Sequence, residues 1–402
     1  MQPNEIARIM LDLVPQWYEA DVGPQSHRIA QEDVSVEFCS HRKLTPDLET
    51  FLTNMRLKLR GFIERYKDAT DIASECIQEE LVLDWLEIQQ SEDHPVDWKR
   101  VINYCRFLNE RTYENSPVSK NIIISTREGE SALDDDCIAK FLDPLAASPH
   151  TFLECDSKLR LVVYAEVQWD EITEPITYSL HPSFLHPIHC RLNSDDSNSY
   201  RFSLHVTSNR DVVIMDKGGM LATCRKGRWR IYDKLTFKNS LVDIFGNYYV
   251  GANLYEPIFD LSYKRHGALL IYDPSHLVLP HVVNQESIIA NASRTRQEVL
   301  STARSLGIGE KLGGSYGLRK MVSELASIDG ALIFDKDNIL AVGAVIESHP
   351  ETAGSIGART TAARSAYRWG AKPIKISADG DVEIFFESRN GDQSCDATMT
   401  FA

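Results

Sequence analysis

Apolar residues along the chain follow helical spacing first and strand spacing later. Between residues 3 and about 113 they recur at steps of three and four, with charged residues between them. The clearest run is Leu48, Phe51, Leu52, Met55, Leu59, Phe62 and Ile63. This spacing places one apolar stripe on each helix, which then packs against a neighbour. The pattern predicts a helical N-terminal domain over residues 1–117, arranged as a bundle or cap.

The middle of the chain changes to short runs of β-branched and aromatic residues. Residues 121–125 (NIIIS) and 159–169 (LRLVVYAEVQW) are typical of strands, and a short helix is expected between them at 134–145. Residues 200–240 hold four more strand-like runs, the last being WRIYDKLTF, separated by Ser-Asn, Gly-Gly and Lys-Gly turn signals. We therefore expect a second region, 118–262, with an α/β segment and an antiparallel meander.

From residue 263 strands and helices alternate. Strands are expected at 267–272, 330–334, 339–345, 373–377 and 382–386, and helices at 297–306, 317–326 and 361–369. The polar residues after Arg389 predict a flexible tail, 391–402. The fold class is therefore α+β or α/β, with a helical N-terminal region, a middle meander and a C-terminal mixed sheet (263–390) flanked by helices.

Composition narrows the class of partner and the compartment. The net charge of −15 opposes a chain-wide surface for nucleic acid or anionic membrane, although a local basic pocket fits within it. No apolar run approaches the ~20 residues that span a bilayer, and residues 1–18 lack the features of a signal peptide. The eight cysteines include no Cys-x-x-Cys pair. We expect reduced thiols and a cytoplasmic protein, with neither nucleic acid nor membrane as partner.

Three short motifs in the last third have residue types suited to chemistry. Asp329-Gly330-Ala331 falls where a helix should end and a strand begin. Its glycine would let a flat ligand approach the backbone, and its carboxylate could hold a divalent cation or accept a hydroxyl proton. A turn-forming Asp-Gly is the ordinary alternative.

The other two motifs could bind phosphate. Gly357-Ala358-Arg359-Thr360-Thr361 leads into a helix, with a threonine as the expected N-cap. Free backbone N–H groups and Arg359 would then face an anion. Ser377 ends a strand and could reach a phosphate or a metal-bound water. An ordinary capped helix and a hairpin turn are the alternatives.

The order of these motifs resembles the diadenylate-cyclase domain superfamily. The likeness is close over residues 329–346 and 357–386 and looser over 265–388, and the upstream HGALLIYDP resembles a feature of the divergent, sensor-like branch of bacterial proteins. The resemblance implies a mixed sheet flanked by helices. It also implies that active members pair face to face and join two ATP molecules into cyclic di-AMP with Mg²⁺ or Mn²⁺.

The resemblance assigns roles to particular residues. Asp329 would assist attack by the ribose hydroxyl. Where the family carries an Arg-His-Arg motif that grips phosphates, this chain has Arg359-Thr360-Thr361, and a shifted register would instead leave Arg364 as the single arginine. Ser377-Ala378 stands where some cyclases have Ser-Glu. Since losing one charge-assisted donor typically costs ~3–4 kcal/mol of transition-state stabilisation, the pattern favours binding over catalysis.

We therefore expect a nucleotide-binding sensor that takes ATP, another purine nucleotide or a cyclic dinucleotide and acts on a separate effector protein. Two alternatives stay open. One is an active diadenylate cyclase or related nucleotidyltransferase, with Asp329 as catalytic residue and metal ligand, Mg²⁺ or Mn²⁺ as cofactor, and homo-oligomeric pairing. Without activity no cofactor is expected. The other is a non-catalytic interaction protein. The expected binding residues are Asp329, Gly330, Ala331, Gly357, Arg359, Thr360, Thr361 and Ser377.

Two further clusters have more ordinary interpretations. His181, His186, His189 and Cys190 lie close in sequence, but their spacing matches no standard zinc finger and two prolines interrupt the segment. The aromatic residues of Gly227-Arg228-Trp229 and Tyr232 could stack on a base, although an aromatic residue on a hairpin usually packs in the core.

Overall fold

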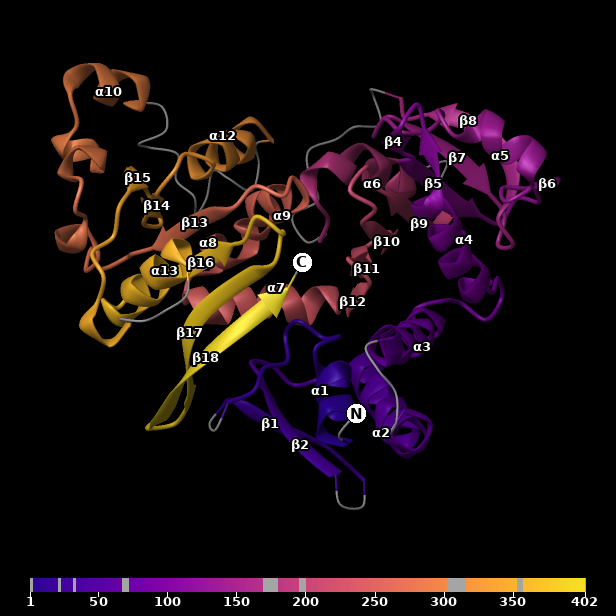
Figure 1. Cartoon of the computed structure of the whole chain (residues 1–402), viewed down its shortest axis with the longest axis horizontal. Coiled ribbons are helices and arrows are strands. Elements are labelled where there is room, and N and C mark those ends of the chain that lie inside the picture. The colour runs from indigo at the N-terminus through magenta and orange to yellow at the C-terminus, as the bar shows by residue number, and fades with distance from the viewer. Residues whose placement is uncertain are drawn as a thin grey trace. The chain divides into compact units, whose positions relative to one another are not determined.

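The computed structural model describes residues 3–20, 23–31, 34–66, 72–168, 180–194, 200–301, 316–352 and 357–401 (Figure 1). The chain divides into two compact units. Unit 1 comprises Met1–Val14, Arg28–Glu37 and Leu44–Lys234; unit 2 comprises Pro15–His27, Phe38–Lys43 and Leu235–Ala402. The domain boundaries expected after residues 117 and 262 stay predictions. No helix in the described ranges is both long enough and apolar enough to cross a membrane.

Helices dominate the N-terminal region. They are α1 (Pro3–Leu11), α2 (Pro46–Tyr66), α3 (Ile72–Ile88) and α4 (Trp98–Glu110). The apolar stripe read from the sequence of α2 is its buried face, from Leu48 to Phe62. The carboxylate of Asp97 accepts a hydrogen bond from the Arg100 N–H at 3.0 Å, which fixes where α4 begins.

A two-stranded hairpin interrupts the region that was expected to be helical. Strand β1 (Gln25–Gln31) pairs with β2 (Val34–Ser40). Val36 and Phe38 are buried while Glu37 between them is exposed, so the burial follows the two-residue period of a strand. The expectation of helix was therefore wrong for residues 25–31 and 34–40.

The central sheet of unit 1 confirms the meander. Its order, among the residues described, is β12-β11-β10-β9-β5-β7-β8-β6. The strands are β5 (Lys120–Ser125), β6 (Ser131–Ala132), β7 (Thr151–Cys155), β8 (Arg160–Glu166), β9 (Tyr200–Val206), β10 (Val212–Asp216), β11 (Gly219–Arg225) and β12 (Arg228–Ile231). β5 and β7 run parallel, and the other neighbours are antiparallel. Short elements complete it: α5 (Asp136–Leu142), α6 (His186–Asn193), and the β3 (Thr112–Tyr113) and β4 (Ser116–Pro117) pair.

The last strand of the meander is shorter than expected. β12 stops at Ile231, and Lys234 opens helix α7 (Lys234–Phe245) instead of continuing the strand. Phe237, Leu241 and Ile244 are buried at steps of three and four, which is the period of a helix.

Unit 2 is a mixed sheet flanked by helices, as expected. The order of the described strands is β15-β14-β13-β16-β17-β18, with β13 and β14 parallel and the other neighbours antiparallel. The strands are β13 (Ala268–Tyr272), β14 (Ala331–Phe334), β15 (Ile339–Ala344), β16 (Lys372–Ile376), β17 (Val382–Asn390) and β18 (Gln393–Phe401). Besides α7, the helices are α8 (Tyr248–Asn253), α9 (Tyr255–Tyr263), α10 (Arg294–Val299), α12 (Tyr316–Ala326) and α13 (Ala358–Arg368). The helix expected at 297–306 overlaps α10, and residues 302–306 lie outside the described part.

The C-terminal residues form a strand, so the expected flexible tail is wrong. β18 pairs with β17 from Gln393 to Phe401, and Figure 1 shows them as one long hairpin. Ala397, Met399 and Phe401 are buried and alternate with exposed residues. The ring of Phe401 meets those of Phe237 and Phe259 at centroid distances of 5.1 and 5.6 Å. The alternation in CDATMTF was the missed signal, because it has the period of a half-buried strand.

Buried neutral histidines form part of the unit 1 core. His205 on β9 lies 2.9 Å from Asn121 Oδ1 through Nδ1 and 2.9 Å from Ser203 Oγ through Nε2, and its side chain is buried. Burial lowers the pKa of His205 to about 3. Burial likewise lowers the pKa of His189 to about 4. Both imidazoles are therefore uncharged in the fold at neutral pH.

Replacing Phe401 by alanine removes a buried ring from the unit 2 core. We expect the free energy of unfolding to fall by roughly 3–5 kcal/mol. Urea unfolding followed by circular dichroism measures the change. Thr400→Ala, at an exposed position of the same strand, is the matched control and should change little. If both variants unfold with the same free energy as the wild type, the C-terminal residues do not pack in the core and form a flexible tail.

The buried histidines predict a loss of stability in mild acid. In the unfolded chain His205 is protonated below the ordinary histidine pKa of about 6.5. In the folded chain it stays neutral until the pH falls to about 3. As the pH is lowered below about 6.5, the free energy of unfolding should therefore fall by about 1.4 kcal/mol per pH unit for each such histidine. Urea titrations at several pH values between 7 and 4 should give a shallower decline for His205→Gln. The control His94→Gln, at an exposed position, should keep the wild-type slope.

Candidate functional site

Strand register brings the three motifs to one edge of the unit 2 sheet. β13 pairs with β14 in parallel, with Leu269 opposite Ala331, and with β16 in antiparallel fashion, with Ala268 opposite Ile376. Extending both registers past the strand ends puts Gly267 between Asp329 on one side and Ser377 on the other. Because neighbouring strands lie about 4.8 Å apart, the backbones of Asp329 and Ser377 are about 10 Å apart across Gly267.

Arg359 reaches the same edge from α13. A Cβ atom built on Gly267 would lie 2.4 Å from Arg359 Nη1 and 3.3 Å from the backbone N of Ala378. The guanidinium therefore covers Gly267 and lies beside the residue that follows Ser377. Arg359 is exposed and makes no hydrogen bond or ion pair with another described residue. Such a guanidinium can accept an anion through two parallel N–H donors.

Asp329 offers an exposed carboxylate at this edge. Helix α12 ends at Ala326 and β14 begins at Ala331, so the residue lies in the expected connection. Within the described ranges its carboxylate accepts one hydrogen bond, from the Gly330 N–H at 3.1 Å. Oxygens left available in this way suit a hydroxyl donor or a divalent cation.

The chain itself accounts for the glycine of Asp329-Gly330-Ala331. Gly330 has a φ of 105°, in the region that favours glycine. A Cβ atom there would lie 2.5 Å from the carbonyl carbon of Gly343 on β15. The close approach expected of a flat ligand is thus already made by the neighbouring strand, and Ala331 is buried as the first residue of β14.

Helix α13 starts earlier than expected and has no side-chain cap. Gly357 is the N-cap residue, with a φ of 91°, and the helix begins at Ala358. The Thr361 hydroxyl donates to the Gly357 carbonyl at 3.1 Å, as a threonine inside a helix does, so a threonine N-cap was wrong. Thr360 is half-buried in the first turn. No side chain among the described residues caps the start of this helix, so its first N–H groups are suited to an anion.

Ser377 serves the hairpin between β16 and β17. Its hydroxyl accepts a hydrogen bond from the Asp381 N–H at 3.1 Å, and its backbone bonds to Asp381 and Gly380 close the turn. Ser377 is therefore a hairpin-turn residue, as the alternative interpretation expected, although its hydroxyl proton can still be donated. Ala378 brings no carboxylate to the edge.

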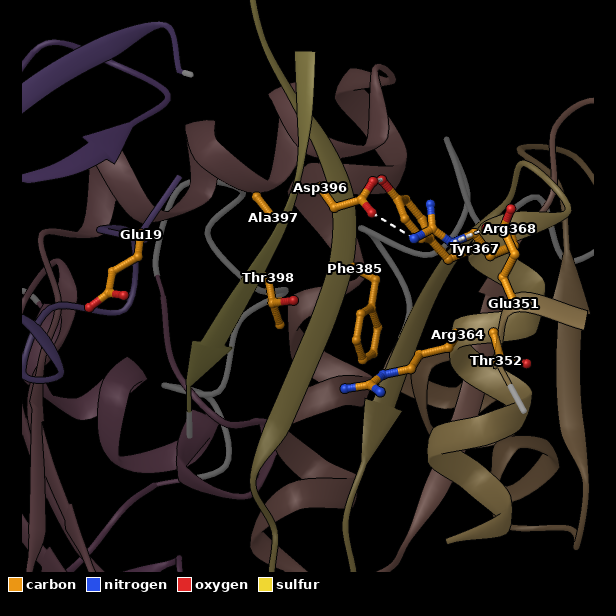
Figure 2. Close-up of a pocket in the computed structure, with 10 residues that line it drawn as sticks. All are labelled: Glu19, Glu351, Thr352, Arg364, Tyr367, Arg368, Phe385, Asp396, Ala397 and Thr398. Carbon is orange, nitrogen blue, oxygen red and sulfur yellow. Dashed lines mark hydrogen bonds and ion pairs between the residues drawn. The ribbon is translucent and has the colours of Figure 1, made fainter. Parts of the chain in front are cut away.

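The two arginines considered for the phosphate role face different places. Arg364 lies five positions after Arg359 on α13, which turns it by about 140° from Arg359 about the helix axis. Figure 2 shows Arg364 pointing into a cavity of about 510 Å³ bounded by α13 and the β17–β18 hairpin. The cavity is lined by Glu19, Glu351, Thr352, Arg364, Tyr367, Arg368, Phe385, Asp396, Ala397 and Thr398, and by none of the eight expected site residues.

Ion pairs occupy one wall of this cavity. Arg368 lies 2.9 Å from Asp396 and 3.3 Å from Glu351, and the Tyr367 hydroxyl donates to Asp396 at 2.7 Å. Burial, followed by the hydrogen bond to Asp396, raises the pKa of Tyr367. These groups hold the last turns of α13 against β18, so they support the helix whose first turn carries Arg359.

The histidine cluster is part of the unit 1 core. His181, His186, His189 and Cys190 are buried, and the rings of His181 and His189 lie 4.4 Å apart. In the described part of the chain, no group of three or more His, Cys, Asp or Glu side chains could hold a metal ion. Trp229 and Tyr232 are also buried, as expected of core residues.

Gly267 is the residue of the edge that the sequence motifs did not single out. The signal was present, because His266-Gly267-Ala268-Leu269 repeats the Gly-Ala-Leu of Gly330-Ala331-Leu332. The two strands that follow these glycines, β13 and β14, are neighbours in the sheet and run parallel.

Comparison with known proteins adds little to these observations. No family model matches the chain, and no curated protein matches it either. A double mutant of DacA from Staphylococcus aureus is 18% identical, with 36% of this chain and 83% of that chain covered at a TM-score of 0.21. A hypothetical membrane spanning protein from Bacillus cereus is 15% identical, with 42% of this chain and 75% of that chain covered at a TM-score of 0.24. Likenesses this low indicate nothing about function on their own.

The packing of Gly330 gives a direct prediction. Gly330→Ala puts a Cβ atom against Gly343 and forces a left-handed residue, so the free energy of unfolding should fall by roughly 1–3 kcal/mol. The control is Gly61→Ala inside α2, where no atom lies within 4 Å of the added carbon and where helix propensity should raise stability. Thermal unfolding of the ligand-free proteins measures both. If the Gly330→Ala protein unfolds at the same temperature as the wild type, the fold does not require this glycine, and ligand binding would be its remaining role.

Proposed function

We propose that the edge formed by Gly267, Asp329, Arg359 and Ser377 binds a purine nucleotide or cyclic dinucleotide through its phosphates. The observation that carries the proposal is the position of Arg359, with its guanidinium over Gly267 and no partner among the described residues. In a chain of net charge −15, a cation without a described partner, beside a helix start that no described side chain caps, is the group that an anionic ligand would neutralise.

The remaining groups of the edge fit the rest of such a ligand. The exposed Asp329 carboxylate can accept a ribose hydroxyl or hold a divalent cation that bridges to phosphate. The separation of about 10 Å between the Asp329 and Ser377 backbones leaves room for a nucleotide to extend from one to the other. Gly267 lies between them, and its lack of a side chain leaves room for the Arg359 guanidinium.

Binding without catalysis fits the residue types better. Phosphoryl transfer depends on several positioned charges that neutralise the moving phosphate. At the first turn of α13 one arginine is followed by two threonines, and the Thr361 hydroxyl is bonded to Gly357. Ala378 gives no second carboxylate. We propose a sensor whose bound nucleotide is reported to a separate effector protein or to a second copy of the chain.

Isothermal titration calorimetry with ATP and Mg²⁺ and with cyclic di-AMP tests the binding. Arg359→Ala removes a charge-assisted donor, and we expect the affinity to fall at least tenfold, which is about 1.4 kcal/mol or more. Arg364→Ala is the matched control on the same helix and should leave the affinity unchanged. Absence of binding to the wild type, or equal losses in both variants, would overturn the assignment and favour an interaction protein.

Retention of Asp329 keeps an active cyclase as the second candidate. The protein is incubated with ATP and Mn²⁺, and the products are examined by mass spectrometry. We expect no cyclic di-AMP. A product that disappears in Asp329→Asn would instead establish a cyclase with Asp329 in the reaction.

A further inference from the structure

A separate cavity of about 380 Å³ lies within unit 1. It is enclosed by α3, α4, and the β9–β10 and β11–β12 turns, and it is unrelated to the nucleotide edge of unit 2. Its lining consists of Glu75, Glu79, Ile102, Cys105, Arg106, Asn109, Asn209, Arg210, Val212, Cys224, Lys226, Gly227 and Trp229.

The floor of this cavity is apolar and aromatic. Ile102, Cys105, Val212 and Trp229 are each at most 5% exposed, so only small parts of them face the open space. Burial raises the pKa of the Cys224 thiol to about 12, and burial raises that of Cys105 as well. Both thiols are therefore protonated at neutral pH, and the floor is suited to packing a flat ring rather than to nucleophilic chemistry.

One polar atom of the floor lacks a partner. The Oδ1 atom of Asn109 is buried and accepts no hydrogen bond from the described residues. A buried acceptor without a donor is unfavourable, and a ligand N–H group would satisfy it. Asn109 lines the cavity, so a ligand held there lies next to this amide.

Cations stand at the rim in conformations that disfavour their residue types. Arg210 in the β9–β10 turn has a φ of 64°, and Lys226 in the β11–β12 turn has a φ of 51°. Glycine and asparagine adopt this left-handed region more readily, and they are the usual residues of such hairpin turns. The chain therefore keeps two cations where other residues would fold better, and Arg210 makes no ion pair with another described residue.

The rim charges favour an anion. Arg106, Arg210 and Lys226 line the cavity, and the carboxylates are those of Glu75 and Glu79. Arg106 pairs with Glu79, which removes one charge of each sign. Glu75 lies beside the turn, since a Cβ on Gly227 would be 2.4 Å from its Oε1. Three cationic and two anionic side chains therefore line the cavity, whereas the whole chain has a net charge of −15.

We propose that this cavity binds a small planar heteroaromatic molecule that carries an amino group and a phosphate, such as a purine nucleoside monophosphate. The ring packs on Trp229 and its neighbours, the amino group donates to Asn109, and the phosphate lies between Arg210 and Lys226. A cavity of this size is within the ordinary range for such ligands.

The experiment uses AMP as the probe and the full chain carrying Arg359→Ala, which is expected to weaken binding at the nucleotide edge of unit 2. Calorimetry should give one AMP bound per chain. Adding Arg210→Gly and Lys226→Asn should reduce the affinity at least tenfold, and adding Asn109→Ala should reduce it as well. Ribose 5-phosphate, which lacks the ring, should bind more weakly than AMP.

The turn substitutions exclude misfolding as an explanation. Because glycine and asparagine suit these positions, the Arg210→Gly, Lys226→Asn protein should unfold at the same or a higher temperature while losing AMP. No AMP binding in the Arg359→Ala background, or binding that the turn substitutions leave intact, overturns this proposal. The proposed function of unit 2 is judged separately, from ATP and cyclic di-AMP on the wild type.

Discussion

The arrangement of unit 2 depends on the pairing of strand β13. All five of its residues are buried, and it hydrogen-bonds to β14 in parallel and to β16 in antiparallel fashion. These two registers place the start of β14 and the end of β16 on either side of Gly267. A shift of one residue would turn the buried side chains to the wrong face, so the burial of β13 holds Asp329 and Ser377 at one edge.

Helix α13 depends on the same strand and adds the cation. Ala363 and Ala366 are fully buried in one cluster with Leu269, Ile271 and neighbouring strand residues. Small side chains let the helix lie close to the sheet, which fixes where its first turn ends. Arg359 then covers Gly267, while Arg364 and Arg368 turn toward β18. Within the part of the chain that the structure describes, this helix thus carries a guanidinium without an ion pair at its start and an ion-paired one near its end.

Positive φ angles occur at glycines, where they suit the residue type, and at two cationic residues beside the unit 1 cavity, where they do not. Gly330 and Gly357 have positive φ values where a left-handed residue is needed, and for Gly330 the neighbouring strand explains the need. Arg210 and Lys226 adopt the same region without the residue type that suits it. A misfit of this kind is unfavourable for folding, and our proposal for the unit 1 cavity gives these two side chains a role.

The sequence alone determined the classes of element and most of their positions, because apolar spacing reports directly on which face of a helix or strand is buried. It gave the mixed sheet of unit 2 and the meander of unit 1, and it selected Asp329, Arg359 and Ser377. It missed the alternation in residues 395–401 and the hairpin at 25–40, where short strands lie beside polar runs. The tertiary structure decided which motifs meet. Register placed Gly267 among them, and helix rotation separated Arg359 from Arg364, because both depend on contacts between residues far apart along the chain.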